Sequence, residues 1–212
     1  GTAQTGFRAP NQAQKFFSKV STTFINDEPV QTGIFQVNST VGNELGIPDL
    51  DEETSVNVSG GVILKPFPRF QITADYFNIQ IDDRITLSGD LGEPGSPGAE
   101  TIRPILQGTG AATASFFTNS IDTETQGVDV TSKFAALLAD GVQLQMRGSF
   151  NWTDTEITGG PRNPTRLEED FGTVILPPDD RRAIEEGALP TTTTKLSAAL
   201  TVGDLDINLR GA

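Results

Sequence analysis

The sequence predicts an all-β fold made of antiparallel strands that run up and down in chain order. Two observations support it: long stretches alternate apolar with polar residues, the period of a strand, and short Pro-, Asp- and Gly-containing connections alternate with long ones. Only 35% of the residues are hydrophobic, and no apolar run approaches the roughly 20 residues that a membrane-spanning helix needs. We therefore expect about six strands and no transmembrane helix.

The clearest expected strand covers residues 142–153. Its apolar side chains share one face with Gly148: Val142, Leu144, Met146, Phe150 and Trp152. Polar residues occupy the other face, and such alternation over about 9–11 residues is typical of a membrane β-barrel wall. Five further strands are expected at 56–64, 70–81, 128–134, 196–202 and 205–209. In the second of these the apolar positions change parity near Tyr76, which predicts a bulge there, or the point where the strand leaves the bilayer.

The connections between these strands predict two different ends. Short turns are expected at 65–68, 138–141 and 203–204, and long ones at 88–115 and 159–190. In an up-and-down sheet, alternate connections lie at the same end, as in outer-membrane barrels with periplasmic turns and extracellular loops. We expect the long connections 88–115 and 159–190 to be extracellular. Two aromatic girdles are predicted as well, one at the short turns and one toward the long loops; their expected members are Phe67, Phe70 and Phe134, and Phe116, Phe117, Phe150 and Trp152.

Charge and composition exclude several functions. The formal net charge is −13 and no run of Lys or Arg occurs, so we expect no nucleic-acid partner. The absence of Cys and His removes Cys-containing zinc sites and the usual general base. No cofactor, metal or catalytic residue is therefore expected.

Two groups of carboxylates invite a functional interpretation. One lies in and beside the expected strands and could supply an acid–base pair: Asp75, Asp82, Asp83 and Asp129. The other precedes the first expected strand and could hold calcium: Asp49, Asp51, Glu52 and Glu53. The first pattern fits wet, lumen-facing groups better than catalysis. The second lacks the spacing and central Gly of an EF-hand, so a solvated acidic turn is the preferred interpretation.

The long connection 159–190 contains four arginines that could bind an anionic ligand through forked hydrogen bonds. They are Arg162, Arg166, Arg181 and Arg182. Ordinary solvation of a loop is the competing interpretation. These four are the only ligand-binding candidates that the sequence offers.

Four phrases resemble the β-barrel of TonB-dependent outer-membrane receptors. Gly6–Pro10 reads GFRAP, a phrase that precedes later strands in that family, and 50–55 is similar to its L-x-P-E-x-S strand opening, with Glu52 in place of Pro. The stretch 75–85, DYFNIQIDDRI, resembles the pattern D-Y-Y/F-x-I-x-I-x-D-R-I. The stretch 118–129 resembles T-N-x-x-x-T-x-G-V-D, and the four follow one another in the family's order.

The resemblance implies a partial segment of a large outer-membrane barrel of about 22 strands with a plugged lumen. It implies an importer of a scarce ligand, such as a ferric siderophore, that engages TonB through a plug absent from residues 1–212. Outer-membrane lipid is the other expected partner, and the open edges of six strands predict self-association of the isolated fragment. The alternatives are a secreted or cell-surface β-rich binding module, such as a carbohydrate-binding or adhesin-like domain, and a glycoside-active enzyme.

Overall fold

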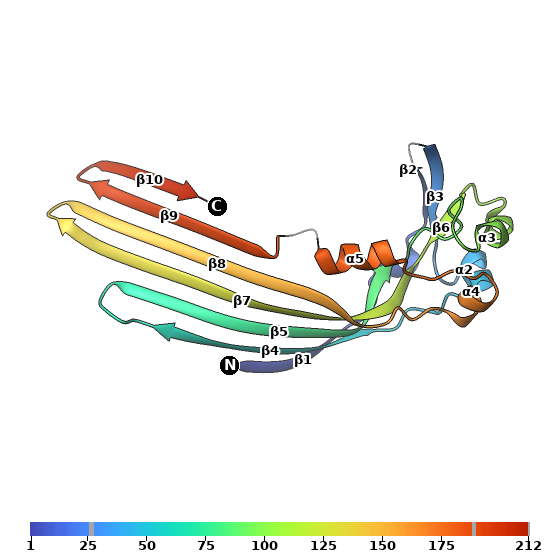
Figure 1. Cartoon of the computed structure of the whole chain (residues 1–212), viewed down its shortest axis with the longest axis horizontal. Coiled ribbons are helices and arrows are strands. Elements are labelled where there is room, and N and C mark those ends of the chain that lie inside the picture. The colour runs from blue at the N-terminus through green and yellow to red at the C-terminus, as the bar shows by residue number, and fades with distance from the viewer. Residues whose placement is uncertain (26–27, 188–189, 212) are drawn as a thin grey trace.

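The computed structural model describes residues 1–25, 28–187 and 190–211, and its body is one long, curved, seven-stranded antiparallel sheet (Figure 1). The strands follow chain order from edge to edge: β1 (Thr2–Arg8), β4 (Glu53–Leu64), β5 (Phe70–Leu87), β7 (Phe117–Ala139), β8 (Val142–Gly159), β9 (Thr192–Val202) and β10 (Leu205–Gly211). The predicted antiparallel up-and-down fold is confirmed, and all six expected strands are present. Most are longer than expected, and β7 reaches 23 residues.

The seventh strand, β1, was not predicted. It pairs with β4 from Thr2 opposite Ser59 to Arg8 opposite Glu53. Its alternation is weak, because only Phe7 is a large apolar residue in it. The presence of β1 turns residues 9–52 into a third long connection, so long and short connections alternate along the whole described chain.

The bulge expected near Tyr76 lies elsewhere. Pairing of β5 with β4 is continuous through Tyr76, and pairing with β7 stays in register from Phe70 to Ile81. The register shifts between Ile81 and Ile85, where Asp83 has a φ of 54°. The parity change at Tyr76 arises because the two faces of β5 exchange polarity there. On the face of Tyr76 the next residue is the polar Asn78. On the other face Phe77 lies over Gly127, whose missing side chain leaves room for the ring.

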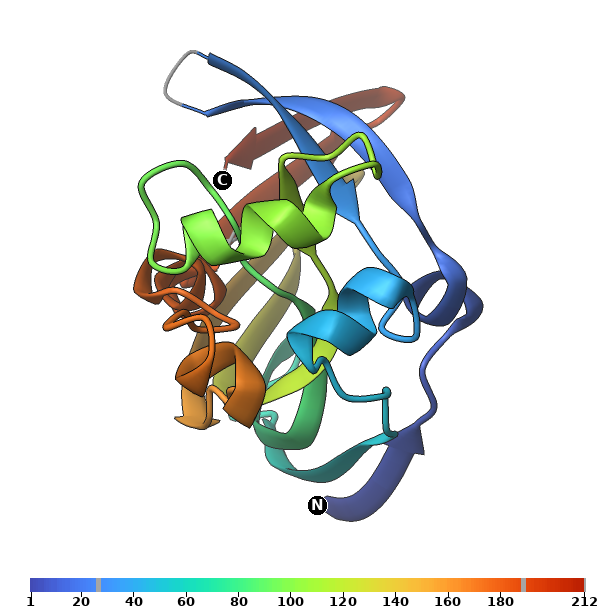
Figure 2. The same ribbon diagram turned by 90° about the vertical axis from the view of Figure 1, so that its right-hand side faces the viewer.

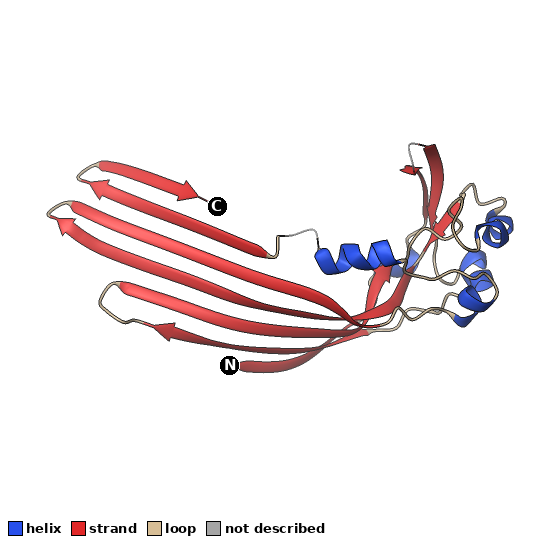
Figure 3. Ribbon diagram, in the orientation of Figure 1, coloured by secondary structure: helices blue, strands red, loops and turns tan. Residues whose placement is uncertain are grey.

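The three short turns lie together at the end of the sheet away from the helices (Figure 3). Gly141 and Gly203 take the left-handed conformation that two of these turns require, with φ values of 72° and 57°. In the third turn Arg69 holds this conformation, with a φ of 71° that glycine normally supplies. The backbone N–H of Phe70 donates to the carbonyl of Phe67 across this turn at 3.3 Å.

The three long connections, 9–52, 88–116 and 160–191, gather at the opposite end and form what we call the loop cap (Figure 2). Its helices are α1 (Gln12–Phe16), α2 (Thr40–Leu45), α3 (Ala99–Leu106), α4 (Thr165–Glu169) and α5 (Pro178–Glu186). Its small sheet contains β2 (Lys19–Ile25), β3 (Glu28–Ile34) and β6 (Thr113–Ser115), with β6 parallel to β3. None of the helices described is long and apolar enough to cross a membrane.

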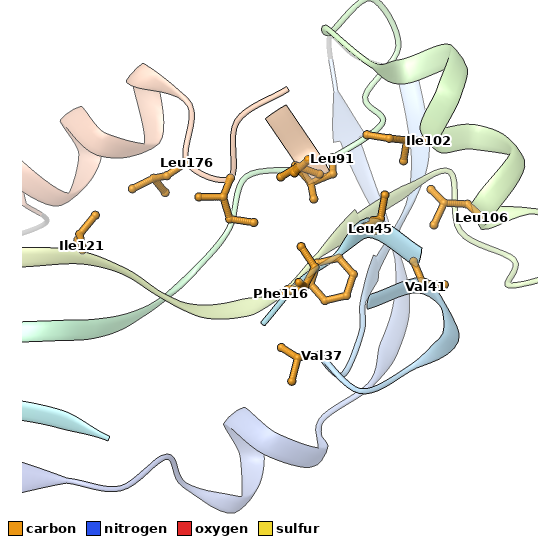
Figure 4. Close-up of a cluster of buried hydrophobic side chains, with 13 residues drawn as sticks. Val37, Val41, Leu45, Leu91, Ile102, Leu106, Phe116, Ile121 and Leu176 are labelled. Atoms are coloured by element: carbon orange, nitrogen blue, oxygen red, sulfur yellow. The ribbon is translucent and has the colours of Figure 1, made fainter. Parts of the chain in front are cut away.

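One hydrophobic core holds the loop cap together (Figure 4). All three long connections contribute to it, together with Ile121 of β7: Val37, Val41, Leu45, Ile47, Leu91, Ile102, Leu106, Ala114, Phe116, Leu167, Ile175 and Leu176. Phe116 is fully buried, and its ring centroid lies 6.2 Å from that of Phe35. Phe116 is therefore a core residue of the cap, and its assignment to an aromatic girdle was wrong.

Local sequence places the cap helices. Ser39 caps α2 by accepting a hydrogen bond from the N–H of Gly42 at 3.1 Å, and Gly46 ends that helix at a φ of 72°. The apolar face of α2 enters the core with Val41 and Leu45. Folding of the connections onto each other thus depends on burial of apolar faces that each connection could not bury alone.

We predict that Phe116→Ala loosens the loop cap without unfolding the wall. Removing a fully buried Phe costs about 3–5 kcal/mol, and only the cap core loses contacts. Hydrogen exchange of the cap amides in the full-length parent should accelerate, while amides of β7 and β8 near the short turns keep their protection. Phe24→Ala is the matched control because Phe24 is 72% exposed. Equal exchange in both variants would contradict a shared cap core.

Candidate functional site

The long sheet presents one continuous apolar face. Residues directly opposite each other in an antiparallel ladder point to the same side. The registers therefore align the apolar positions of the six strands from β4 to β10, for example Ala74, Val130 and Phe150 in one row, and Leu144, Leu200 and Ile207 in another. Many of these side chains have no protein cover, with Leu196 64% and Leu209 68% exposed. This outward face suits the hydrocarbon of a bilayer.

A polar boundary ends this apolar band on the cap side. In one row Tyr76 is opposite Val128, which is opposite Trp152, so the chain's only tyrosine and only tryptophan lie at the same level. The next rows on the same face are polar or acidic: Asn78, Gln126 and Asp154, then Gln80, Glu124 and Glu156. Tyr and Trp favour membrane interfaces because one end of each side chain is apolar and the other is polar.

The position of this boundary shifts from strand to strand across the sheet. The last outward apolar residue of β4 is Val56, which pairs with Gln80, four residues beyond Tyr76. In β9 it is Leu196, which pairs with Gly148, four residues before Trp152. A flat membrane boundary crosses tilted strands in this way, and barrel strands tilt by about 35–45°. The band thus covers 56–64 of β4, 70–76 of β5, 128–139 of β7, 142–152 of β8 and 196–202 of β9.

The opposite face of the sheet, which a closed barrel would turn to its lumen, is mostly polar. In the band it carries Gln, Ser, Thr, Asn, Asp, Lys and Arg side chains, for example in the row of Thr73, Thr131, Ser149 and Lys195. Asp75 and Asp129 face each other in the neighbouring row, and Asp129 accepts a hydrogen bond from Asn151 at 2.7 Å. The wall therefore separates an apolar exterior from a wet interior.

An ion pair whose carboxylate is buried joins three strands of the wall at the base of the first long connection. Arg8 of β1 donates two hydrogen bonds to Glu53 of β4, at 2.5 and 2.6 Å, and the N–H of Ile85 donates to the same carboxylate at 2.7 Å. Glu53 is only 6% exposed. Its expected place in a solvated turn was wrong, because the partner Arg8 is 45 residues away in sequence. Asp49, Asp51 and Glu52 are exposed, as expected.

A second ion pair anchors the third connection to the strand bulge. Arg162 donates to both carboxylate oxygens of Asp122, at 2.8 and 2.6 Å, and lies 3.4 Å from Asp83. The backbone N–H of Asp83 donates to Asp122 at 2.8 Å. Burial alone would raise the pKa of Asp122, but the hydrogen bonds from Arg162 and Asp83 outweigh it and lower the pKa.

The four arginine candidates do not converge on one site. Arg162 is held by Asp122, Arg166 lies 3.3 Å from Asp170, and Arg182 lies 3.6 Å from Asp179. Arg181 stands beside Arg182 in α5 and has no carboxylate within 4.0 Å among the residues described. Ligand binding by these residues stays a prediction, and for three of them a neighbouring carboxylate already satisfies the charge.

The carboxylates weighed for catalysis are dispersed. Asp75 and Asp129 face the lumen side, Asp82 is opposite Thr54, and Asp83 belongs to the Arg162 anchor. Within the part of the chain that the structure describes, no three His, Cys, Asp or Glu residues are arranged to hold a metal ion. Sequence reasoning missed Arg8 and Asp122 as members of ion pairs; Arg8 stood in the GFRAP phrase, but its partner could not be named without the β1–β4 register.

Comparison with known proteins agrees with this geometry. The model of the family described as TonB dependent receptor-like, beta-barrel, matches residues 1–202. The chain belongs to this family. Its members are receptors and transporters of the bacterial outer membrane, not enzymes, so the predicted location and the expectation of no catalysis are confirmed, and the binding-module and glycosidase alternatives are set aside.

Solved structures show the same fold at low identity. One described as the structure of the RagAB peptide transporter superposes with a TM-score of 0.58 at 14% identity, covering 98% of this chain and 25% of that chain. One of the RagAB peptide importer in the "closed-closed" state gives 0.54 at 14% identity, with 97% and 25% covered. Curated proteins yield no match. The chain thus spans about a quarter of the solved structures that it matches and is a segment of the receptor barrel wall.

We predict that the same substitution destabilises the barrel to different extents at two neighbouring alanines of β9. Ala198 lies in the outward row of Met146 and Leu209, whereas Ala199 lies in the lumen-side row of Gln145 and Asn208. Ala198→Arg should destabilise the full-length barrel by about 2–4 kcal/mol if it lies near the bilayer midplane, because the cation faces lipid, and Ala199→Arg by about 1 kcal/mol or less. Folding into lipid vesicles, followed by the gel shift of folded barrels, measures both; equal effects would contradict the assignment of faces.

We predict that the Arg162 anchor is stable at neutral pH and lost in acid. The pKa of Asp122 is lower in the folded protein than in the unfolded chain, so its contribution is fully present above the ordinary aspartate pKa of about 3.9 and falls as pH drops through the lowered value. The protection of the 160–176 amides, corrected for the intrinsic pH dependence of exchange, should fall only below about pH 4. Asp122→Asn should already exchange faster at pH 7 and show a smaller change in acid. An identical pH profile in both proteins would contradict this anchor.

Proposed function

We propose that the parent protein imports a scarce nutrient through the outer membrane with energy supplied through TonB. In this proposal residues 1–212 supply about a quarter of the barrel wall, and the plug that engages TonB lies elsewhere in the polypeptide. The observation that carries it is the apolar outward face, with its tilted polar boundary and its row of Tyr76, Val128 and Trp152. Only a sheet that stands in a bilayer needs such a boundary.

We propose that the loop cap is extracellular and the short turns are periplasmic. Support comes from the sorting of connection lengths, since barrels of this class have short periplasmic turns and long extracellular loops. The two expected loops, 88–115 and 159–190, fold together with 9–52 around one core. The cap is thus a packed structure at the mouth of the barrel, where an incoming ligand meets the receptor first.

The charge of the cap narrows the ligand class. In each of the three connections carboxylates outnumber Lys and Arg, and three of the four candidate arginines are paired with carboxylates. A surface of one sign repels ligands of the same sign at long range. We therefore propose a ligand without net negative charge. A ferric siderophore, the ligand class that the family resemblance suggested, fits when the chelate is neutral or cationic; a peptide, the cargo named for RagAB, fits on the same condition.

Uptake by the full-length receptor tests this function. Cells that produce the parent protein should accumulate a neutral or cationic labelled nutrient, from a panel of iron chelates and peptides, only when TonB is present. Accumulation that persists without TonB would contradict energised transport. Preference for anionic members of the panel would contradict the proposed ligand class while leaving transport intact.

We predict that the two ends of the wall differ in accessibility in intact cells. The described chain has no cysteine, so single cysteines report position directly. Glu100→Cys in α3, where the side chain is 86% exposed, should react with a membrane-impermeant maleimide. Asp204→Cys, in the turn between β9 and β10, should react only after the outer membrane is permeabilised. The unsubstituted receptor gives the background, and the reverse order of labelling would place the cap in the periplasm.

A further inference from the structure

A hollow of about 530 Å³ interrupts the apolar outward face near the short turns. We call it the outer groove. Its large apolar side chains are Phe67, Phe70, Phe134, Met146, Leu196 and Leu209. Ser132 and Gly148, directly opposite each other in one outward row, line it as well, and their small size leaves room between the larger neighbours. The lining residues that alternate with these along the strands, such as Arg147 and Arg210, belong to the rows of the other face.

The outer groove runs across the strands and is inclined to the membrane. One row of its lining leads from Phe70 of β5 through Phe134, Met146 and Ala198 to Leu209 of β10, which is four strand spacings, about 19 Å at roughly 4.8 Å each. Phe70 is the last residue of the apolar band in β5, whereas Ala198 lies four residues before the end of the band at Val202 in β9. The groove therefore starts at the membrane surface beside β5 and descends into the hydrocarbon toward β10.

Two cations flank the shallow end of the groove. The turn 65–69 reads KPFPR, and Lys65 and Arg69 are both exposed. Phe67 of this turn stacks on Phe70 with ring centroids 5.0 Å apart, so the turn lies against the groove. A second hollow, of about 690 Å³, is lined by Lys65 and Arg69 and shares Phe67 and Phe70 with the groove.

No described carboxylate neutralises these two cations. None of the ion pairs between described residues involves Lys65 or Arg69. The lining of both hollows contains no Asp and no Glu. Unpaired positive charge at the membrane surface attracts anionic lipid headgroups.

The combination of an apolar groove and a basic turn fits one kind of amphiphile. A phosphate at the membrane surface accepts charge-assisted hydrogen bonds from Lys and Arg, whose long apolar stems let the charged ends reach headgroup level. One leaflet contributes about 15 Å of hydrocarbon, half of a core of roughly 30 Å, so an inclined groove of about 19 Å suits a single acyl chain. A zwitterionic headgroup would bring a cation of its own, and no carboxylate lines the hollows to receive it.

We propose that the outer groove and the turn 65–69 form a binding site for an anionic phospholipid of the periplasmic leaflet. One acyl chain lies along the row from Phe70 to Leu209, and the phosphate contacts Lys65 and Arg69. The assignment to this leaflet rests on the proposed function, which places the short turns in the periplasm. Lipid elsewhere on the apolar face exchanges freely, whereas this position selects one class of headgroup.

Photo-crosslinking of the full-length receptor tests the headgroup contact. The receptor is placed in phosphatidylcholine nanodiscs that contain phosphatidylglycerol with a photoreactive acyl chain, and the cross-linked peptides are mapped. Lys65→Gln with Arg69→Gln should raise the amount of probe needed for half-maximal labelling roughly 25-fold, because each cation contributes a factor of about five. Lys15→Gln with Lys19→Gln, the same change of net charge on exposed residues of the cap, should leave labelling unchanged.

Filling the groove tests the acyl-chain contact. A Cβ at Gly148 would lie 2.9 Å from Oγ of Ser132 and 3.2 Å from Cδ2 of Leu196, and both are ends of side chains that can turn away. Gly148→Leu should therefore fold and abolish labelling of the peptides that contain residues 132–148. Ala136→Leu, on the same face but outside the groove, should retain it. The gel shift of folded barrels confirms that each variant keeps its wall.

The remaining outcomes separate the lipid site from the proposed function. Equal labelling by photoreactive phosphatidylglycerol and phosphatidylcholine would overturn the site, as would undiminished labelling of folded Gly148→Leu. Displacement of the probe by lipid A more readily than by unlabelled phosphatidylglycerol would assign the groove to the opposite leaflet, and displacement by inorganic phosphate would exclude an acyl-chain contact. Absence of TonB-dependent uptake would refute the proposed function, while the lipid preference in nanodiscs is measured independently of transport.

Discussion

The register of the seven-stranded ladder is the constraint on which the remaining structure depends. Side chains alternate with a period of two, so a slip of one residue between two strands would turn the apolar set of one strand to the lumen. The pairings of β5 with β7 and of β7 with β8 keep one parity through the whole apolar band. They also place Tyr76 and Trp152, from different strands, at one level. A bilayer selects this register strongly because each misplaced polar side chain would face hydrocarbon.

Above the apolar band the same strands meet different requirements. β5, β7 and β8 continue toward the cap, and there the outward face becomes acidic. In this region one ion pair ties wall strands together and another connects the wall to the third long connection. Glu53 joins β1, β4 and β5 by accepting from Arg8 and from the N–H of Ile85. Asp122 joins β7, the β5 bulge and the third connection through Arg162. Both ion pairs couple segments far apart in sequence, and through Arg162 the position of the third connection depends on the register of the wall.

Features of the fold that depend on neighbouring residues could be predicted from the sequence, whereas those that depend on contacts between distant residues could not. The six strands, the short turns and the sorting of connection lengths follow from local alternation and turn residues, and the structure confirms them. Strand β1 escaped because its seven residues contain a single large apolar side chain. The cap core was not predicted because its residues come from three connections, none of which shows a regular apolar periodicity. Glu53 was predicted to be solvated because its partner, Arg8, is 45 positions away in sequence and is identified only by the strand pairing.

The acidic and basic residues occupy different parts of the molecule: the cap surface is acidic, and cations lie on the lumen side of the wall. Exposed ion pairs within the cap are weak individually, and they leave its surface acidic. The cations of the lumen side, in contrast, stand on strands where the pleat directs each side chain away from the apolar face. Phe134 and Met146, the neighbours of Lys133 and Arg147 on the other face, must both point outward, and this fixes the register of β7 and β8. The same register places Lys133 opposite Arg147. The bilayer thus determines, through the apolar side of the wall, which charges the lumen side presents.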